Sequence, residues 1–448
     1  MQPLTIEELP YCADSAPLFA RLLDLEQPVY LDSAAPFSAR GRYDIFSAAP
    51  VALCETSSST SPASSKTTFF DELQHSLQQH LPAINNDYHL PFTGGALGFF
   101  GYDLSRQLEE IPAFAIQDST LADASVGIYS WAVVVDHRKR RAVLVAHPHT
   151  DLKVLTDIRQ RLNSNEGRPD TVDFQLESAF TANLSKTDYR QAFETIQRYI
   201  SAGDCYQINL AQRFSADFEG SPWQAYQRLR STAAAPFSAY IQTKNQAILS
   251  VSPERFLHLA NQRVSTSPIK GTIGRGRTPE QDQQLAQQLL NSAKDRAENL
   301  MIVDLLRNDL GKTCKHGSIQ VDELFELQSF ETVHHLVSTI SGQLKKGNTA
   351  IDLLASCFPG GSITGAPKVR AMQIIEELEP HRRSAYCGAI GYISCDGQMD
   401  TNIAIRTMVC EQNKIHCWAG GGIVADSECE SEYQECLTKV EKLLAALA

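Results

Sequence analysis

The chain has 448 residues, a formal net charge of −12 and 43% hydrophobic residues. That length leaves room for about two or three average domains and a sizeable core. The negative charge argues against nucleic acid and anionic membranes as partners, so an anionic substrate must meet locally placed cations or a metal. No run of about eighteen apolar residues and no signal-peptide pattern is present, so we expect a cytoplasmic protein.

The eleven cysteines are scattered without a Cys-x-x-Cys pair. This spacing favours reduced thiols over a zinc cage or a disulfide framework. Polar residues from Asn163 to Asp173 mark a boundary in the sequence. We therefore expect an N-terminal region over residues 1–165 and a C-terminal region over residues 180–448.

Local patterns predict several elements in chain order. Two short strands are expected within residues 28–49, and a hairpin is expected within residues 124–147. A capping box of Ser185 and Asp188 predicts the start of a helix, which Gly203 would end.

The next strand, predicted over residues 205–214, places the amides of Gln207 and Asn209 on one face. Two amides on one side of a strand indicate a polar cavity, because buried polar groups need partners. A half-exposed strand explains the same pattern equally well.

Lys270 follows Pro268-Ile269 and precedes Gly271. Proline rigidifies the backbone and glycine permits close approach of a ligand, so the amine can be aimed at a fixed place. A lysine held in this way is a candidate nucleophile. The competing interpretation is a solvated surface charge, which is the usual fate of lysine.

Two pairs of acids lie three residues apart on predicted amphipathic helices, Asp295 with Glu298 and Glu432 with Glu435. Residues at this spacing project from the same side of a helix. Oxygen ligands from two helices can converge on a hard divalent cation, and such ligands select Mg²⁺ over zinc. Solvated helix faces remain the alternative interpretation.

Several segments between these helices suit an anion. Pro367 is expected in the first turn of a helix, which would direct free amides and Lys368 at an anionic group. Gly420-Gly421-Gly422 offers another run of exposed amides, and Arg406 could clamp a carboxylate through two hydrogen bonds. Each of these features is equally compatible with a turn or a buried ion pair.

Together, these motifs resemble those of the chorismate-utilising enzymes, over nearly the whole chain. They are Ser252-Pro253-Glu254-Arg255-Phe256, Pro268-Ile269-Lys270-Gly271-Thr272, the stretch 297–305, Gly365-Ala366-Pro367-Lys368 and Gly420-Gly421-Gly422-Ile423-Val424. The resemblance implies an α/β (α+β type) fold, in which large antiparallel sheets pack as a sandwich with helices outside. The active site would lie in a cleft.

Lys270 points to one branch of that family. Anthranilate synthases typically carry alanine at this position, and isochorismate and salicylate synthases place a water-activating lysine where this chain has Gln207. The resemblance therefore implies that Lys270 attacks C2 of chorismate, with Glu254 as the general acid for the departing C4 hydroxyl. Ammonia would then enter at C4 and expel the lysine, giving 4-amino-4-deoxychorismate with the enolpyruvyl group retained.

The resemblance also implies roles for other residues. Glu298 and Glu435 would bind magnesium, with Asp295 and Glu432 beside them directly or through water. Arg406 and Tyr386 would hold the enolpyruvyl carboxylate. The remaining substrate pocket would be formed by Gly421, Gly422, Thr364, Lys439, His335 and Gln207.

Some family members bury a tryptophan in their N-terminal half. The positions of this chain that match that pocket are Ser33, Arg40, Gly41, Arg42, Tyr43, Pro236, Phe237 and Ser238. Bound tryptophan is accordingly a further expectation, as a structural ligand or as an inhibitor.

No cysteine here lies in a nucleophile context with a paired histidine and glutamate, so a separate glutamine amidotransferase subunit is expected to supply ammonia. Two alternatives to the amination of chorismate at C4 stay open. One is an anthranilate synthase, which also releases pyruvate. The other is a non-catalytic regulatory protein that binds an amino acid.

Overall fold

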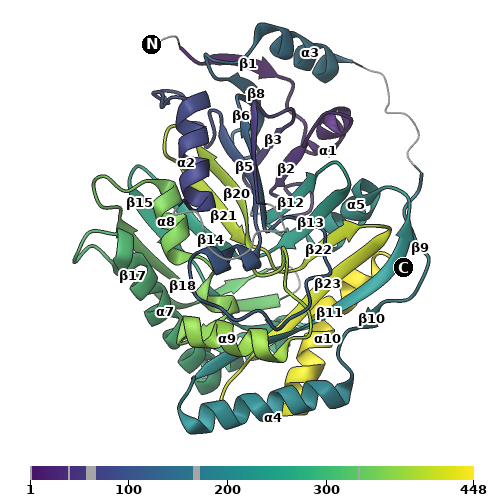
Figure 1. The fold of residues 1–448 in the computed structure, drawn as a ribbon, viewed down its shortest axis with the longest axis vertical. Coiled ribbons are helices and arrows are strands. Elements are labelled where there is room, and N and C mark those ends of the chain that lie inside the picture. The colour runs from purple at the N-terminus through teal and green to yellow at the C-terminus, as the bar shows by residue number, and fades with distance from the viewer. Residues whose placement is uncertain (1–2, 39–40, 57–66, 165–171, 331–332) are drawn as a thin grey trace.

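The computed structural model describes residues 3–38, 41–56, 67–164, 172–330 and 333–448. Within these ranges the chain forms two large antiparallel sheets surrounded by helices (Figure 1). Arg40, one of the expected tryptophan ligands, lies outside the described residues. The α/β architecture predicted from the sequence is confirmed.

The first sheet has 13 strands in the described ranges and takes strands from both ends of the chain. In order across the sheet they are β1 (Thr5–Leu9), β8 (Arg141–Ala146), β7 (Trp131–Asp136), β3 (Tyr43–Ser47), β2 (Val29–Asp32), β12 (Phe237–Gln242), β13 (Gln246–Ser252), β22 (Thr407–Glu411), β23 (Lys414–Ile423), β11 (Gln207–Glu219) and β10 (Thr181–Ala182), and β11 also pairs with β19 (Gly365–Ala366) and β9 (Gln175–Leu176).

The second sheet has 10 strands in the described ranges and likewise combines early and late segments. In order across the sheet they are β16 (Ile269–Gly274), β18 (Val333–Gln343), β15 (Arg263–Thr266), β14 (Arg255–Ala260), β21 (Met399–Ile403), β20 (Ala389–Ser394), β5 (Gly95–Phe100), β6 (Ala124–Tyr129) and β4 (Ala52–Glu55), with β17 (Gln320–Ser329) also paired to β18.

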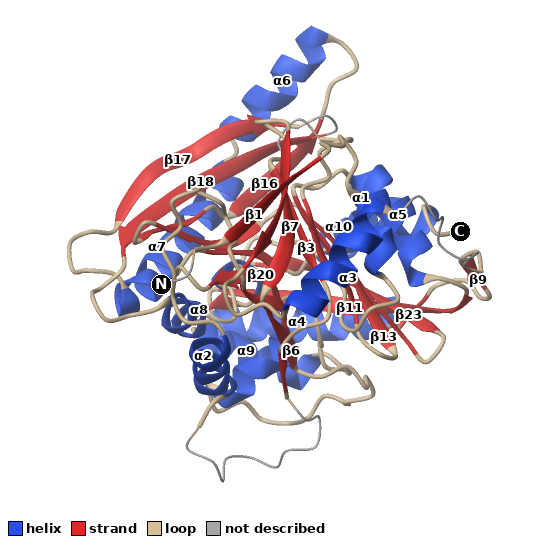
Figure 2. Ribbon diagram, turned by 90° about the horizontal axis from the view of Figure 1, so that it is seen from above, coloured by secondary structure: helices blue, strands red, loops and turns tan. Residues whose placement is uncertain are grey.

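Helices cover the outer faces of both sheets. They are α1 (Ala16–Phe19), α2 (Phe69–His80), α3 (Leu152–Asn163), α4 (Lys186–Ala202), α5 (Pro222–Ala233), α6 (Pro279–Leu290), α7 (Ala293–Thr313), α8 (Ala350–Cys357), α9 (Lys368–Leu378) and α10 (Cys429–Ala445), with short 3₁₀ turns η1 (Ala20–Leu22), η2 (Tyr102–Gln107) and η3 (Gly361–Ile363). Helix α6 and the β17–β18 ribbon project from the body (Figure 2).

The largest hydrophobic core lies between the two sheets. It joins Ile45 and Val134 of the first sheet to Val126 and Ile390 of the second. A second cluster on the outer face of the first sheet packs against α1, α3, α5 and α10. Alternation along each strand divides residues between these layers, because successive side chains point to opposite faces.

Two neighbouring connections carry the chain from one sheet to the other. Strand β13 of the first sheet runs into β14 of the second, and β21 of the second runs into β22 of the first. The two crossings lie side by side, because β13 pairs with β22 and β14 pairs with β21. Glu254 stands in the first crossing and Arg406 in the second. The topology thus brings these two residues close to one seam between the sheets.

Several local predictions agree with the structure. Helix α4 begins with the capping box of Ser185 and Asp188, and it ends at Gly203 in the left-handed conformation with a φ of 82°. The stretch 124–147 contains three strands where one hairpin was expected. Strand β6 pairs in the second sheet, whereas β7 and β8 form the predicted hairpin in the first.

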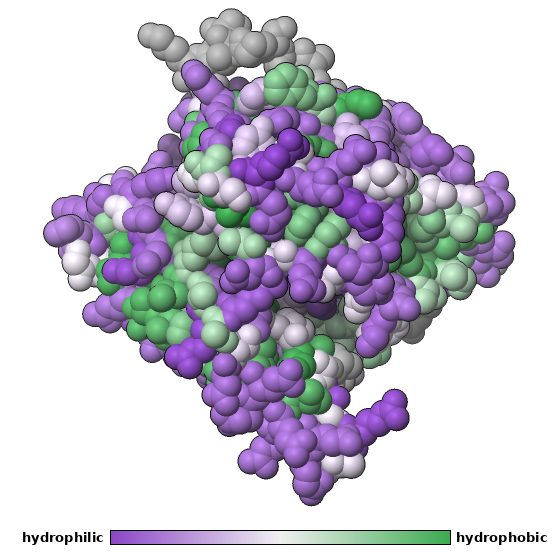
Figure 3. Space-filling model, turned by 90° about the horizontal axis from the view of Figure 1, so that it is seen from below, coloured by the Kyte–Doolittle hydropathy of each residue, from purple (hydrophilic) through white to green (hydrophobic). Residues whose placement is uncertain are grey.

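All eleven cysteines fall within the described ranges and are free thiols. Among the helices of the described ranges, none combines the length and apolar character needed to cross a membrane. Hydrophilic side chains cover most of the face shown in Figure 3, and hydrophobic side chains gather in smaller patches.

Candidate active site

Lys270 lies on β16, where the strand is locally irregular. Its pairing partner on β18 is Leu336, and the register shifts before Thr272. The shift falls at Gly271, which has a φ of 78°. A side-chain carbon at Gly271 would lie 3.1 Å from Asp295 of α7. Glycine therefore permits both the bulge and the close approach of α7 to the strand that carries Lys270.

Glu254 is buried at the crossing between β13 and β14, with 5% of its surface exposed. Its carbonyl accepts a hydrogen bond from the Ile403 amide at 3.0 Å, which ties the two crossings together. Burial raises the pKa of Glu254 from 4.5 to about 6, against the opposing effects of the Ser362 hydroxyl and the Lys270 charge. Such a carboxyl can exchange a proton near neutral pH.

Lys270 shares this environment. Burial lowers the pKa of the Lys270 amine from its ordinary value, although Glu298, Glu254 and Glu435 act in the opposite direction. Its Nζ donates a hydrogen bond to the Ser362 carbonyl at 3.2 Å. The predicted nucleophile and the predicted general acid therefore lie in one electrostatic neighbourhood.

The acidic residues of α7 and α10 face each other around a cation. Lys294 Nζ lies 4.0 Å from Glu298 Oε1 and 3.4 Å from Glu432 Oε1. Glu435 instead pairs with Lys439, Nζ to Oε1, at 2.7 Å. The Lys439 charge and hydrogen bond outweigh burial and lower the pKa of Glu435.

These acids fit a magnesium ion that takes most of its ligands from water and substrate. In the described ranges, no three His, Cys, Asp or Glu side chains form a cluster that could hold a metal ion by themselves. Magnesium commonly takes only one or two protein carboxylates and completes its shell with water and substrate oxygens. The Lys294 ammonium between Glu298 and Glu432 marks a position that already accommodates positive charge.

The glycine-rich end of β23 lies against these acids and against Gln207. A side-chain carbon at Gly421 would lie 3.1 Å from Glu432 Oε2, and one at Gly422 would lie 2.5 Å from Gln207 Nε2. Gln207 is fully buried, and neither polar atom of its side-chain amide has a partner among the described residues. A buried, unpaired amide is costly unless a ligand or water meets it.

Arg406 also lacks a side-chain partner among the described residues, and its side chain carries a full charge. Its guanidinium makes no hydrogen bond or ion pair that involves the described side chains, and burial alone lowers its pKa. The residue has a φ of 51°, and its carbonyl accepts the Val251 amide at 3.0 Å. An unpaired, partly buried guanidinium is suited to a carboxylate ligand.

The other predicted pocket residues lie on neighbouring elements. Tyr386 is buried and stacks on Trp418 of β23, with ring centroids 6.2 Å apart. His335 shares a 2.8 Å hydrogen bond with Thr272 on the strand of Lys270. The Thr364 hydroxyl donates to the Gly360 carbonyl at 3.1 Å, so it holds its own turn.

Two lysines that were expected to contact a ligand, Lys439 and Lys368, form hydrogen bonds with the protein. Lys439 Nζ donates to the Gly420 carbonyl at 2.8 Å, in addition to its pairing with Glu435. The prediction that Lys368 points at an anionic ligand is wrong. Its Nζ pairs with Asp309 at 2.5 Å and donates to the Cys357 carbonyl at 2.9 Å, because the buried carboxylate of α7 competes for it.

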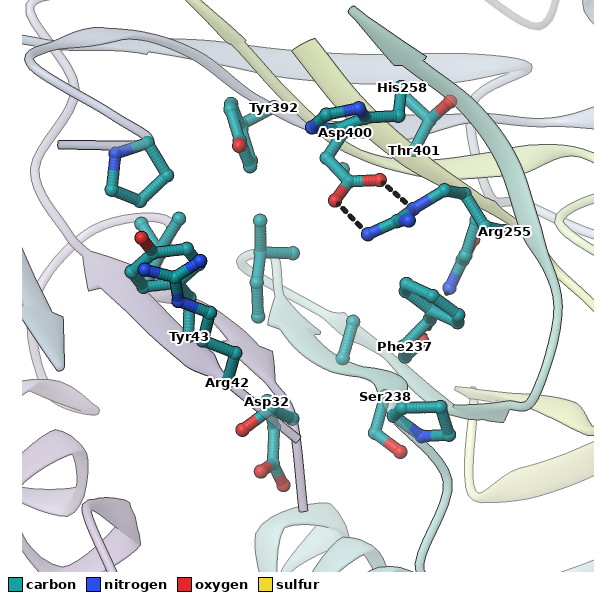
Figure 4. A pocket seen from close by; sticks show the side chains of 18 of the residues that line it. Asp32, Arg42, Tyr43, Phe237, Ser238, Arg255, His258, Tyr392, Asp400 and Thr401 are labelled. Carbon is teal, nitrogen blue, oxygen red and sulfur yellow. Dashed lines mark hydrogen bonds and ion pairs between the residues drawn. The ribbon is translucent and has the colours of Figure 1, made fainter. Parts of the chain in front are cut away.

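A separate cavity of about 650 Å³ opens between the two sheets. Six of the expected tryptophan ligands line it together, namely Ser33, Arg42, Tyr43, Pro236, Phe237 and Ser238. Gly41 is not among the lining residues but contacts one of them, since a side-chain carbon at Gly41 would come within 2.3 Å of the Ser33 carbonyl oxygen. Figure 4 shows side chains from both sheets facing this space, including the Arg255–Asp400 ion pair with both hydrogen bonds at 2.9 Å.

Chain segments that carry Glu254 and Lys270 also line this cavity. Pro253 and Arg255 line the cavity on either side of Glu254 in sequence, and Ser267 and Ile269 line it just before Lys270. Glu254 and Lys270 themselves do not line the cavity, because side chains alternate along extended backbone and theirs point to the other side of the same segments.

Comparison with known proteins identifies the family of this chain. The family described as chorismate binding enzyme matches residues 26–445. This chain belongs to that family.

Individual relatives of this chorismate-binding chain are similar over nearly their full length. Aminodeoxychorismate synthase component 1 of Salmonella typhimurium is 47% identical, over 99% of this chain and 98% of its own length. The protein of the same name from Escherichia coli is 48% identical, over 96% and 95%. The crystal structure of anthranilate synthase component I from Streptococcus pneumoniae superposes with a TM-score of 0.80 at 32% identity, covering 91% of this chain and 93% of its own.

Sequence reasoning missed two residues of this candidate site. Ser362 contacts both Glu254 and Lys270. Arg383 is 1% exposed and donates to the carbonyls of Ile363 and Asn209 at 3.0 and 2.6 Å. Ser362 lies shortly before the segment of Pro367 and Lys368 that was expected to bind an anion, whereas nothing in the local pattern around Arg383 signals a buried guanidinium.

Proposed function

We propose that this chain is an aminodeoxychorismate synthase component 1, which converts chorismate and ammonia to 4-amino-4-deoxychorismate. The observation that carries the proposal is Lys270, a lysine of lowered pKa beside the buried carboxyl of Glu254. Identity of 47% over almost the entire length with a relative of that name supports it.

The proposed reaction begins with neutral Lys270. Its amine forms a bond to C2 of chorismate while both ring double bonds shift, from C1=C2 to C1=C6 and from C5=C6 to C4=C5, and the C4–oxygen bond breaks. Glu254 supplies the proton that lets the C4 oxygen leave as water, since hydroxide is a poor leaving group. Burial favours both starting forms, because it disfavours charge on the amine and on the carboxyl alike.

The second half of the reaction releases the lysine. Ammonia forms a bond to C4, both double bonds shift back to C5=C6 and C1=C2, and the C2–nitrogen bond to Lys270 breaks. The proton lost by the incoming nitrogen returns to the Glu254 carboxylate or to the departing Lys270 amine. Each step conserves protons between these two groups and the substrate, and the enolpyruvyl group is untouched.

Other residues would hold the two carboxylates of chorismate. Arg406, whose guanidinium has no partner in the described ranges, is proposed to clamp the enolpyruvyl carboxylate with Tyr386 beside it. The amides of Gly421 and Gly422 and the unpaired side chain of Gln207 would complete the contacts.

Magnesium is proposed as the cofactor, held by Glu298 and Glu435 with Asp295 and Glu432 beside them. When bound, it would supply positive charge to the ring carboxylate of chorismate. Lys294, which now lies between Glu298 and Glu432, would have to move aside. Equilibrium dialysis with magnesium alone, comparing the wild type with Glu298→Gln, tests this binding independently of turnover.

Ammonia is proposed to come from a glutamine amidotransferase subunit. The name "component 1" of the relatives implies a second component for those proteins. Burial raises the pKa of Cys357 and Cys387 to about 12, which disfavours reactive thiolates at these positions. We also propose a cytoplasmic location, consistent with eleven free thiols.

One incubation distinguishes the candidate functions. The purified chain is mixed with chorismate, magnesium and ammonia, and the product is identified by mass. Aminodeoxychorismate supports the proposal, and anthranilate with pyruvate would identify an anthranilate synthase. Unchanged chorismate would favour a non-catalytic protein that binds an amino acid.

The second cavity is proposed to hold tryptophan. Its lining combines the aromatic rings of Tyr43 and Phe237 with the hydroxyl groups of Ser33 and Ser238, which suits an aromatic amino acid. The test is to denature the purified protein and identify the released amino acids by mass. If no tryptophan is released and added tryptophan leaves the melting temperature unchanged, the assignment fails.

A further inference from the structure

Ser362, in the turn η3, contacts both proposed catalytic side chains. Its hydroxyl donates a hydrogen bond to Glu254 Oε1 at 2.9 Å, and its carbonyl accepts one from Lys270 Nζ at 3.2 Å. The residue is 7% exposed. It is separated from these partners by 108 and 92 positions in the sequence. Ser362 is therefore a bridge between the two groups that the tertiary fold creates.

The turn that carries Ser362 is fixed from several sides. Arg383 donates to the Ile363 carbonyl at 3.0 Å, and the Asn209 amide donates to the Thr364 carbonyl at 2.9 Å. A side-chain carbon at Gly361 would lie 2.5 Å from the Leu305 side chain, so α7 presses directly on the turn. A turn held in this way can impose its geometry on the side chains that it touches.

Glu254 and Lys270 attract each other but form no direct ion pair within 4 Å among the described residues. Each interacts with a different part of Ser362 instead. A direct pair would favour an ammonium beside a carboxylate, because opposite charges in contact stabilise one another. The proposed reaction needs the opposite arrangement, with a neutral amine and a protonated carboxyl.

We propose that Ser362 is a positioning residue that keeps Glu254 and Lys270 from pairing directly. This inference rests on the proposed function, because it concerns which of the two groups, Glu254 or Lys270, holds the proton that the reaction uses. The hydroxyl holds the carboxyl group of Glu254 in place, and the backbone carbonyl directs the amine without placing a charge next to it.

Other charged groups also face this pair. Lys439 acts on both groups, and Glu298 and Glu435 act on Lys270 from α7 and α10. Cys387 also interacts with Glu254. These contributions are common to wild type and variant, so a change on removing one hydroxyl reports on Ser362.

The test compares pH profiles of kcat for the wild type, Ser362→Ala and Ser362→Thr. Without the hydroxyl, Glu254 is expected to turn toward Lys270. The acidic limb of the bell-shaped profile would then move to lower pH and the basic limb to higher pH, since the form of the pair that carries one proton becomes more stable. The maximum kcat would fall roughly 10- to 100-fold, because most molecules with one proton on the pair would then hold it as the inactive ion pair of ammonium and carboxylate. KM is expected to stay constant, and Ser362→Thr is expected to restore both limbs.

A buried hydroxyl elsewhere provides the matched control. Ser250 is fully buried and shares a 2.9 Å hydrogen bond with Thr407 rather than with Glu254 or Lys270. Ser250→Ala is expected to leave the positions of both limbs unchanged. If Ser362→Ala lowers kcat without moving either limb, or moves the acidic limb toward higher pH, the inference is overturned.

A labelling experiment reports on Lys270 without turnover. Acetic anhydride acetylates neutral amines, and peptide mass spectrometry measures modification of Lys270 across a pH series. Ser362→Ala is expected to move this labelling to higher pH, and an unchanged or lower midpoint would contradict the inference. The product formed by the wild type tests the proposed function separately, so either proposal can fail alone.

Discussion

Replacing Glu254 with glutamine should stabilise the protein at neutral pH while abolishing most of its activity. Burial raises the pKa of Glu254 from 4.5 to about 6, so the native state binds this proton more tightly than the unfolded chain does. The wild type therefore loses stability as the pH rises through that interval, and the loss is complete above it. At about 1.4 kcal/mol per pH unit, the total is about 2 kcal/mol.

Glutamine has nearly the same shape and can still accept the Ser362 hydrogen bond, but it never ionises. The free energy of unfolding of Glu254→Gln, relative to wild type, should rise by about 2 kcal/mol between about pH 4 and pH 7.5. Urea unfolding at both pH values measures this difference. Turnover of the variant should fall by roughly 10²- to 10⁴-fold, as expected for loss of a general acid.

An exposed glutamate provides the control for this experiment. Glu194→Gln, on the solvent face of α4, should show no comparable rise with pH. If Glu254→Gln is no more stable relative to wild type at pH 7.5 than at pH 4, the carboxyl is not held in its neutral form by burial. Glu254 would then lack the raised pKa that a proton donor near neutral pH requires.

Three further substitutions test other parts of the site. Lys270→Ala should abolish the covalent adduct, seen by mass spectrometry as chorismate less one water on the intact chain, and undiminished turnover would remove the covalent step. Arg406→Gln should raise KM for chorismate roughly 10- to 100-fold, through loss of charge-assisted hydrogen bonds, and an unchanged KM would place the carboxylate elsewhere. Arg383→Met should lower the free energy of unfolding by about 3–5 kcal/mol, because it leaves buried Glu379 unpaired. Adding Glu379→Gln should restore much of that loss in urea unfolding, and a double variant as unstable as the single one would contradict this account.

Elements with a local signal were predicted well from the sequence. The capping box at Ser185 and the left-handed Gly203 define α4 through contacts within a few residues. The acid pairs likewise lie on helices, α7 and α10, as their spacing predicted. These features depend on neighbours in the chain, which a sequence displays directly.

Features that depend on distant partners were not predictable in this way. Lys368 was expected to face a ligand, but Asp309 from another helix holds it. Arg383 and Ser362 acquire their roles only after segments far apart in sequence meet. Which sheet a strand joins is also decided by tertiary packing, as β6 and β7 illustrate by entering different sheets with one residue between them.

The segments around Glu254 and Lys270 form part of the wall of the cavity of about 650 Å³. A molecule filling this cavity would contact Arg255 and Ile269, and a shift of either residue would displace its neighbour, Glu254 or Lys270. A few substitutions among the residues that line the cavity would therefore be enough to convert a purely structural ligand into an inhibitor. The chemistry of the reaction would need no change for the enzyme to gain feedback control.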